Sequence, residues 1–171
     1  MKIEHTSQND YLISVLIPEY NNECFLERCV KSVYTQNFNS LEIVIVNDHS
    51  HIFTFRKIIK NIIKECSAWR IKNNFSPVHF VILENQKNEG TLETLRNAFY
   101  HSNGKYIMVL ESDDVLYPDS LINLCKATEN GSFDIVQGNT LNGTFNKDEV
   151  FNISENPRNT KLYSGKRYDS R

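Results

Sequence analysis

The chain has 171 residues, of which 40% are hydrophobic and 23% charged, and its formal net charge is −2. This composition is typical of a globular protein with one sizeable core, and it gives no reason to expect a nucleic-acid-binding surface. No apolar run approaches the roughly 18 residues that cross a bilayer, and the polar leader at residues 1–10 lacks the apolar segment of a signal peptide. We therefore expect a cytoplasmic protein whose four cysteines are free thiols.

Hydrophobic periodicity predicts alternating strands and helices along residues 11–138, which we take as one domain. The predicted strands are apolar runs without strict alternation, as is typical of a parallel sheet covered on both faces. They cover residues 11–17, 41–46, 78–83, 106–110 and 133–136. The predicted helices have apolar residues at helical spacing and cover residues 23–36, 53–69, 91–102 and 118–129. This order predicts an α/β fold with a mostly parallel sheet flanked by helices.

A few single residues indicate where these elements begin and end. Pro18 is expected to end the first strand, because proline has no amide hydrogen for the ladder. Thr91 is expected to cap the third helix, and Asn103-Gly104 to stop it. Pro118 is expected at the start of the fourth helix, where a missing amide hydrogen is tolerated.

Polar residues dominate from residue 139 onward. Asn142-Gly143 predicts a hairpin turn, with residues 149–153 as its return strand. Residues 156–171 carry too little apolar surface to hold a structure by themselves. We therefore assign residues 139–171 to a hairpin and a polar tail, outside the domain at residues 11–138.

The strand predicted at residues 106–110 ends abruptly in three carboxylates, those of Glu111, Asp113 and Asp114. Carboxylates this close repel one another unless a cation lies among them. Hard oxygen ligands at the end of a parallel strand suit a Mg²⁺ or Mn²⁺ ion that carries a phosphorylated ligand. The alternative is an acidic loop that caps the next helix, which a short motif alone does not exclude.

Polar clusters follow the first four predicted strands, at residues 18–22, 47–50, 84–90 and 111–114. In a parallel sheet these segments lie at the same edge, where ligands bind at a switch in strand order. We therefore expect one ligand site rather than four unrelated loops.

Four stretches of the chain resemble the family 2 glycosyltransferases with the GT-A fold. The opening strand, turn and helix of the family are similar to SVLIPEYNNECFLERCVKSVYTQNF, and its second strand is similar to LEIVIVNDHS. The third loop is similar to ENQKNEG, and the metal-binding strand with its DxD-type motif is similar to NGKYIMVLESDDVLYPDSL. One such match carries little weight, but four in this order extend the resemblance over residues 12–137.

The resemblance implies an inverting glycosyltransferase that passes a sugar from a nucleotide-diphosphate donor, usually a UDP-sugar, to a hydroxyl of a glycan or a lipid-linked saccharide. It also implies a divalent metal, Mn²⁺ or Mg²⁺, that neutralises the leaving diphosphate. The metal ligand implied is Asp113. The implied nucleotide-sugar-binding residues are Pro18, Tyr20, Asn21, Asp48, Gly90, Arg96, Glu111 and Asp114.

Each implied residue has a physical task. Tyr20 would flank the base, Asp48 would accept a hydrogen bond from the uracil imide, and Gly90 would allow close backbone approach to the donor. Glu111 would face the ribose or a metal-bound water, and Asp114 would support the site.

Two of these assignments have alternatives in the sequence. Tyr20 could pack under the first helix instead. Asp48 could simply form a turn, or serve as the phosphoacceptor of a receiver domain. A receiver would need an acidic pair after its first strand, where this chain has Pro18-Glu19-Tyr20.

Three features depart from the family pattern. Glu111 stands where the family usually has Asp, and one extra methylene moves the carboxylate by roughly an ångström. The arginine often found early in the third helix would fall at Leu95, and Arg96 lies about 100° further around the helix. The family's general base would lie beyond Arg171. No residue is therefore assigned as catalytic base, and the resemblance implies an incomplete acceptor side at the C-terminal end.

Two alternatives remain open. The chain could be a truncated or degenerate relative that binds nucleotide without catalysis. Lys57, Lys60 and Lys64 are interpreted as a solvated helix face, with contact to phosphate or a membrane as the minor alternative. A peripheral position at the inner face of the membrane would suit a lipid-linked acceptor.

Overall fold

The computed structural model describes residues 13–128, 135–138, 143–145, 151–153 and 162–163. The chain divides into two compact units, residues 1–118 and residues 119–171. The division follows Pro118, so the domain predicted at residues 11–138 spans the first unit and part of the second. The polar leader predicted at residues 1–10 lies outside the described residues.

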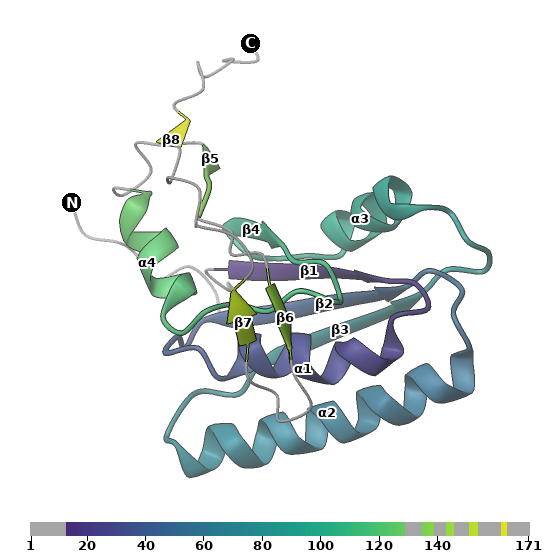
Figure 1. Cartoon of the computed structure of the whole chain (residues 1–171), viewed down its shortest axis with the longest axis horizontal. Helices are drawn as coiled ribbons and strands as arrows, with labels where there is room; N and C mark the ends of the chain where they lie inside the picture. Colours follow the sequence, from purple (N-terminus) through teal and green to yellow (C-terminus); the bar gives the residue numbers. More distant parts are fainter. Residues whose placement is uncertain (1–12, 129–134, 139–142, 146–150, 154–161, 164–171) are drawn as a thin grey trace. The chain divides into compact units, whose positions relative to one another are not determined.

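The first unit is a four-stranded sheet with helices on both faces (Figure 1). The strand order is β3-β2-β1-β4, and every neighbouring pair is parallel. The strands are β1 (Ile13–Glu19), β2 (Leu41–Asn47), β3 (His79–Glu84) and β4 (Tyr106–Val109). The helices are α1 (Glu23–Tyr34), α2 (Ile52–Lys72) and α3 (Thr91–Tyr100). The predicted α/β fold with a parallel sheet flanked by helices is confirmed.

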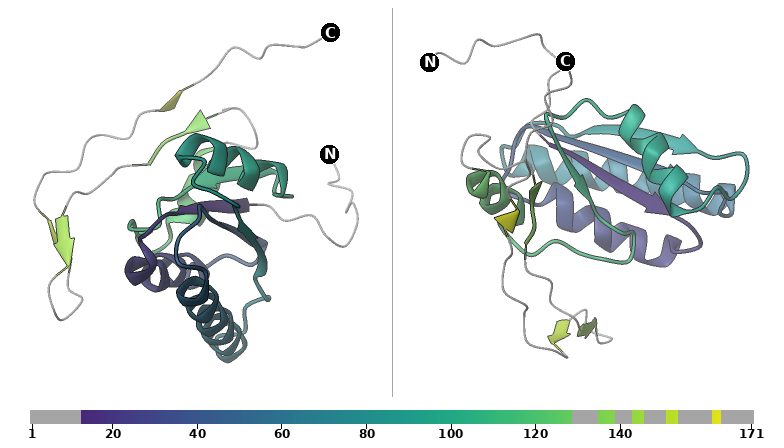
Figure 2. Two further views of the ribbon diagram at one scale, coloured as in Figure 1. Left: turned by 90° about the vertical axis from the view of Figure 1, so that its right-hand side faces the viewer. Right: turned by 90° about the horizontal axis from the view of Figure 1, so that it is seen from above.

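The helices are divided between the two faces of this sheet. α1 and α2 pack side by side against one face, and α3 packs on β1 and β2 from the other (Figure 2, left). Every residue of β1 and β2 is therefore buried, as their continuous apolar runs predict. On the α3 side the core consists of Leu16, Val44, Val46 and Ala98, with Val81, Leu83 and Leu95 packed against it.

β1 runs two residues further than predicted, because Pro18 does not interrupt it. Pro18 pairs with Val46 inside the parallel ladder. The Glu19 carbonyl accepts a hydrogen bond from the Asp48 amide on the β2 side, so the backbone of Pro18 faces the opposite side. There the pairing with β4 has already ended at Leu16. The missing amide hydrogen therefore removes no ladder bond.

β4 is exposed on one face, so the prediction that both faces of this strand are covered is wrong for the described residues. Ile107 is 38% and Val109 49% exposed. Both lie on the α3 side of the sheet, because Val109 pairs with the core residue Leu16. α3 packs on β1 and β2 and leaves these two side chains uncovered.

Several helix ends differ from the prediction. α2 is 21 residues long and extends beyond the predicted range at both ends. α3 is preceded by Gly90 at its N-cap position, so the predicted cap at Thr91 is wrong. Gly90 has a φ of 81°, a backbone conformation that glycine adopts without strain. In the described part of the chain, no helix is both long and apolar enough to cross a membrane.

The second unit contains one helix and four short strands in its described residues. They are α4 (Ser120–Ala127), β5 (Ile135–Val136), β6 (Gly143–Phe145), β7 (Phe151–Ile153) and β8 (Leu162–Tyr163). The helix begins two residues after Pro118, because Asp119 has a φ of 62°. β6 and β7 pair antiparallel, and β7 lies within the predicted return strand at residues 149–153. The predicted turn at Asn142-Gly143 is wrong, because Gly143 belongs to the first strand, and Asn142 lies outside the described residues.

The predicted fifth strand does not join the parallel sheet. β5 pairs antiparallel with β8, which lies in the tail that was expected to lack structure. Backbone hydrogen bonds make this pairing, and they do not depend on the apolar content by which the tail was judged. The predicted end of the fourth helix near residues 129–131 lies outside the described residues.

The four cysteines are free thiols, as predicted. Burial, together with the nearby carboxylates of Asp114 and Asp113, raises the pKa of Cys29 to about 12. Burial likewise raises the pKa of Cys66 to about 11. These two thiols are therefore protonated at neutral pH and act as small apolar core residues.

Candidate functional site

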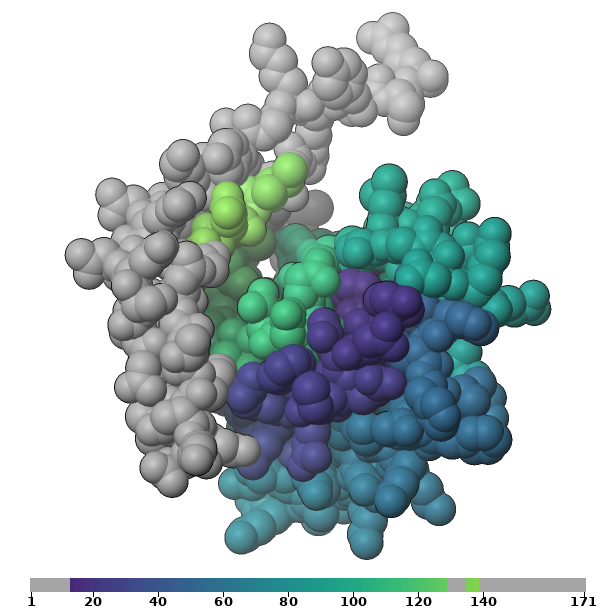
Figure 3. Space-filling model, turned by 45° about the vertical axis from the view of Figure 1, so that its right-hand side comes forward, coloured from purple at the N-terminus to yellow at the C-terminus, as the bar shows by residue number. Residues whose placement is uncertain are grey.

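The segments that follow β1, β2, β3 and β4 lie at one edge of the first sheet, because the four strands are parallel and in register. Figure 3 shows this edge, with the purple end of β1 and start of α1 between the green segment after β4 and the blue segment after β2. The structure thus brings together the four polar clusters that the sequence places after the strands.

The first two segments are held together by Glu19, the last residue of β1. Its side chain is 1% exposed. Glu19 Oε1 accepts a hydrogen bond from the Asn22 amide at 2.9 Å, and Oε2 accepts one from Ser50 Oγ at 2.9 Å. Ser50 Oγ in turn accepts one from the Asn21 amide at 2.8 Å. Desolvation raises the pKa of Glu19, although the bonds from Asn22 and Ser50 act against it.

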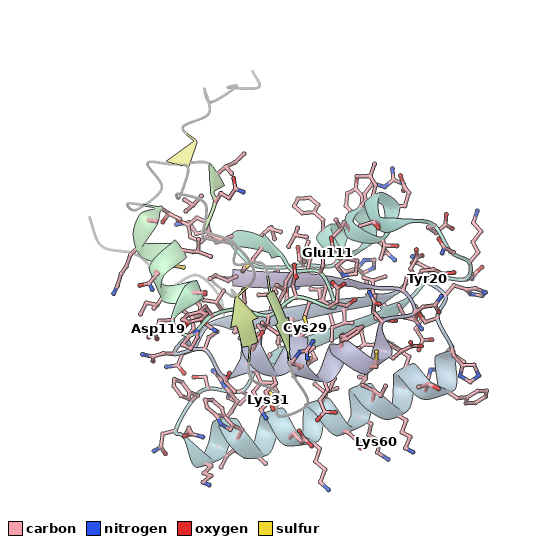
Figure 4. The ribbon with its side chains drawn as sticks, viewed as in Figure 1. Tyr20, Cys29, Lys31, Lys60, Glu111 and Asp119 are labelled. Atoms are coloured by element: carbon pink, nitrogen blue, oxygen red, sulfur yellow. The ribbon has the colours of Figure 1, made fainter. Side chains whose placement is uncertain are left out.

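The hydrogen bonds of Glu19 and Ser50 shape the turn that carries Tyr20 and Asn21. Asn21 has a φ of 54°, in the left-handed region that asparagine tolerates. Tyr20 is 48% exposed at the strand-end edge (Figure 4), so it is not buried under α1, the alternative that the sequence left open. Pro18, by contrast, is buried in the ladder.

Asp48 is the anchor of the loop between β3 and α3. Its side chain accepts three hydrogen bonds, from Asn85 Nδ2 and the Glu89 amide at 2.8 Å and from the Gly90 amide at 2.9 Å. Desolvation alone would raise the pKa of Asp48, but the hydrogen bonds from Glu89, Asn85 and Gly90 outweigh it and lower the pKa. The carboxylate is therefore ionised at neutral pH and fixes the backbone at Gly90.

This arrangement limits what Asp48 offers to a ligand. The residue is 3% exposed, and most of the roughly four lone-pair sites of its carboxylate are occupied by the protein. A contact with a uracil imide would use the lone-pair site of the carboxylate that the protein leaves unoccupied. This contact stays a prediction. Within the chain, Asp48 already accepts hydrogen bonds from the loop of residues 85–90.

Asn85 extends the anchor into α3. Its amide nitrogen donates to Thr94 Oγ1 at 3.1 Å, and its side-chain oxygen accepts from Asn97 Nδ2 at 2.9 Å. Thr94 is fully buried. The start of α3 therefore has a fixed position relative to the end of β2.

Arg96 lies on the exposed side of α3 and forms an ion pair with Glu93 at 2.7 Å. Leu95, its neighbour, packs against the core of the sheet. A contact of Arg96 with a diphosphate would require the guanidinium to leave Glu93 or to be shared with it, so this role stays a prediction.

The acidic segment after β4 forms a turn against α1. The Asp114 amide donates to the Glu111 carbonyl at 3.0 Å, and Cys29 Sγ of α1 donates to the same carbonyl at 3.5 Å (Figure 4). Ser112 is buried, whereas Glu111, Asp113 and Asp114 are exposed. The turn therefore presents three carboxylates to the outside.

These carboxylates fit a divalent cation by their chemistry. Desolvation and the charges of Asp113 and Asp114 raise the pKa of Glu111, and desolvation and the charge of Asp113 raise that of Asp114. Burial and the neighbouring charges thus disfavour the ionised forms of Glu111 and Asp114, a condition that a hard cation relieves. Among the described residues, however, no three side chains of the ligand types already converge on one point.

The sequence analysis missed the residues that hold the site together. Glu19, Ser50 and Asn85 were not among the predicted site residues, yet they connect the segments that carry those residues. Glu19 carried one usable signal, since it is a charged residue placed directly at the end of a buried apolar run. Asn85 carried none, because its partners Asp48 and Asn97 are distant in sequence.

A protein-family model described as "Glycosyl transferase family 2" matches residues 14–170 of the chain. Chondroitin synthase from Escherichia coli is 32% identical over 159 residues, which make up 93% of this chain and 21% of that protein. The UDP-Glc:alpha-D-GlcNAc-diphosphoundecaprenol beta-1,3-glucosyltransferase WfgD from Escherichia coli is 26% identical over 144 residues, 80% of this chain and 51% of that protein. The chain thus spans about half or less of the length of these relatives.

A solved structure shows the same arrangement of sheet and helices. It is the mannosyltransferase PcManGT from Pyrobaculum calidifontis in complex with GDP-Man and Mn²⁺. The TM-score is 0.58 at 18% identity, with 71% of this chain and 33% of that chain covered. At this identity the likeness shows the fold alone.

Proposed function

Because this chain belongs to glycosyl transferase family 2, we propose that it is the donor-binding part of an inverting glycosyltransferase. Its sheet has the GT-A fold, as the solved relatives indicate. In this proposal the donor is a UDP-sugar and the acceptor is a hydroxyl of a glycan or a lipid-linked saccharide. Support comes from the name of WfgD, which states a UDP-Glc donor and a diphosphoundecaprenol-linked acceptor.

The observation that carries the proposal is the cross-bracing of the strand-end segments. Glu19 joins the segment after β1 to the segment after β2, and Asp48 joins the latter to the loop before α3. A ligand site needs side chains whose positions are fixed by such supporting contacts. Here the supported edge also carries an exposed aromatic ring, that of Tyr20, and the exposed carboxylates after β4.

The proposal assigns a task to each part of this edge. Tyr20 flanks the base, Asn21 and Pro18 line the nucleotide pocket, and Gly90 lets the backbone approach the donor. Arg96 is the candidate for the diphosphate.

Asp113, supported by Glu111 and Asp114, is the proposed ligand of a Mn²⁺ or Mg²⁺ ion. The bound metal supplies positive charge that neutralises the departing diphosphate. The chain's own part is to hold the carboxylates at the exposed turn, which the Glu111 carbonyl anchors to Cys29 of α1. No catalytic base is assigned.

The test is a calorimetric titration of UDP into the 171-residue protein, with and without Mn²⁺. We expect binding that depends on the metal, and we expect Asp113→Asn to weaken it by at least about tenfold, because even the loss of a residue that supports a metal ligand typically costs about 10–100-fold in metal affinity. Asp119→Asn is the matched control, since Asp119 is also exposed and asparagine tolerates its φ of 62°. The Asp119→Asn protein should bind UDP with the affinity of the wild type.

Three outcomes would contradict the proposal in different ways. Equal UDP affinity of Asp113→Asn in Mn²⁺ would remove Asp113 from the site. Absence of UDP binding by the folded protein would remove the nucleotide site altogether. Binding of UDP-sugars without any release of UDP, in a protein that includes the acceptor half, would favour the alternative of a relative that binds nucleotide without catalysis.

A further inference from the structure

The outward side of α2 carries a row of lysines between two exposed apolar residues. These residues are Phe53, Lys57, Lys60, Lys64 and Ile71, which we call the α2 stripe. Their spacings of 4, 3, 4 and 7 residues keep them on one side of a helix with 3.6 residues per turn. Figure 4 shows Lys60 on the side of α2 that faces away from α1 and the sheet.

Packing within the first unit does not account for the stripe. The buried side of α2 consists of Phe55, Ile59, Ile62, Cys66 and Arg70, on the opposite side of the helix. Phe53 is 77% and Ile71 75% exposed, and they stand near the two ends of the helix. Two large apolar side chains are therefore held in the open at either end of the lysine row.

The charge of the stripe is local and of one sign. The chain as a whole has a net charge of −2. The acidic residue of α2 is Glu65, which lies about 100° around the helix from Lys64. The described ion pair of α2 involves Arg56 and Glu84, not the three lysines. The lysines are thus available to an external anionic surface.

A shallow apolar groove adjoins the stripe. It has a volume of about 370 Å³ and lies between α2 and β3. Ile59, Ile63 and Ile82 give it an apolar lining, and Lys60 belongs to both the groove and the stripe. Positive charge and apolar surface therefore occur side by side, as they do on helices that lie in the interface of a lipid bilayer.

We propose that the α2 stripe, with this groove, docks the protein on an anionic lipid surface. The three lysines attract acidic headgroups, and Phe53 and Ile71 enter the boundary between headgroups and acyl chains. The stripe extends from residue 53 to residue 71, a distance of 18 rises or about 27 Å at 1.5 Å per residue, so it contacts the surface along its length. A lipid surface is favoured over an acidic protein because both apolar ends need an apolar phase.

This docking brings the candidate site close to the lipid. α2 begins at Ile52, two residues after Ser50 of the site, and its first turn lies at the strand-end edge of the sheet (Figure 1). A lipid-linked acceptor would therefore be within the same layer as that edge. The docking itself is independent of the proposed sugar transfer, so its test requires no donor.

The test measures partition of the full chain onto vesicles of phosphatidylcholine with and without phosphatidylglycerol. We expect binding only to the anionic vesicles. The triple variant Lys57→Gln, Lys60→Gln, Lys64→Gln should lower the partition coefficient by roughly 100-fold, about fivefold for each lysine near an anionic surface. The double variant Phe53→Ser, Ile71→Ser should weaken the binding that remains at high salt, where charge attraction is screened.

The control variant removes three exposed lysines elsewhere, at Lys31, Lys105 and Lys126. It changes the net charge by the same amount and should reduce binding far less than the stripe variant. An equal loss in the two triple variants would overturn the proposal, since net charge would then explain the binding. Absence of wild-type binding to anionic vesicles, or retention on an acidic polypeptide alone, would also overturn it. UDP titration of each variant shows whether its nucleotide site still binds UDP. A loss of vesicle binding can thereby be distinguished from a failure of the nucleotide site.

Discussion

At the scale of single residues, Asp48 has a structural task that does not depend on any ligand. Its carboxylate accepts hydrogen bonds from the backbone amides of Glu89 and Gly90 and so fixes the position of the loop before α3. The chain turns at Gly90, whose φ is 81°, just before α3 begins, and these two hydrogen bonds hold that turn. A residue predicted for base contact is therefore also a positioning residue for the loop before α3.

We predict that Asp48→Asn lowers the free energy of unfolding by about 1–3 kcal/mol, the usual effect of leaving buried hydrogen-bonding groups unsatisfied. The new amide group would set a donor against the amide of Gly90 or Glu89. Denaturant unfolding measures the change, and amide exchange at Gly90 should accelerate. Asp113→Asn, at an exposed position, should stay within about 0.5 kcal/mol of the wild type. Equal stabilities of Asp48→Asn and the wild type would refute the anchoring role.

At the scale of elements, the connection from α3 to β4 is hydrogen-bonded to the sheet at the end opposite the candidate site. Glu42 of β2 accepts hydrogen bonds from the amide and the side chain of Asn103, at 2.8 and 2.9 Å. Ser14 Oγ donates to the same carboxylate and accepts from the Gly104 amide at 2.7 Å. The Asn103-Gly104 pair that the sequence marks as a helix stop thus also fastens the crossover to β1 and β2.

Gly104→Ala tests how tightly this connection approaches β1. A Cβ atom at residue 104 would meet the backbone nitrogen and the hydroxyl of Ser14, and it would lie 2.9 Å from the carbonyl carbon of Ile13. We predict a loss of about 1–3 kcal/mol in the free energy of unfolding, as for other overpacked sites. Gly138→Ala is the control, since its nearest neighbour would be Leu124 Cδ2 at 3.7 Å. A thermal melt of both variants suffices, and a stable Gly104→Ala protein would show that the connection is looser than the structure indicates.

At the scale of the whole molecule, buried carboxylates link stability to pH. Desolvation alone would raise the pKa of Glu42, but the hydrogen bonds from Asn103, Ser14 and His79 outweigh it and lower the pKa below 4.5. A group with a lowered pKa stabilises the folded state above its unfolded pKa. Its contribution disappears as the pH falls through the folded pKa. Glu42 therefore makes the protein less stable in acid.

We predict that Glu42→Gln is less stable than the wild type by about 2 kcal/mol at neutral pH. The difference should shrink as the pH falls below 4.5, because the unfolded wild-type chain then binds a proton at Glu42 that the folded protein takes up only at lower pH. Denaturant titrations at several pH values measure it. Glu27→Gln, at an exposed position of α1, should show no such convergence. A difference that stays constant down to strongly acidic pH would contradict the assignment to Glu42.

Much of the first unit could be predicted from local sequence pattern. The continuous apolar runs of β1 and β2 predicted strands buried on both faces, and the alternation with helices predicted a parallel sheet. The resemblance to family 2 glycosyltransferases is confirmed by the family match over residues 14–170. These features repeat with a fixed period or occur in a fixed order, so they can be read without knowledge of distant contacts.

What the sequence could not determine depends on neighbours that are distant along the chain. Pro18 remains in its strand because its backbone faces the side where β4 has already ended, and β4 is exposed because α3 packs elsewhere. Glu19 and Asp48 hold the candidate site together through hydrogen bonds to Ser50 and Gly90, which lie 31 and 42 residues away along the chain. The sequence by itself therefore determined most elements of the first unit, the family and the edge at which the candidate site lies. The tertiary structure alone decided which side chains hold that edge in place, because hydrogen bonds between loops depend on the packing of the whole sheet.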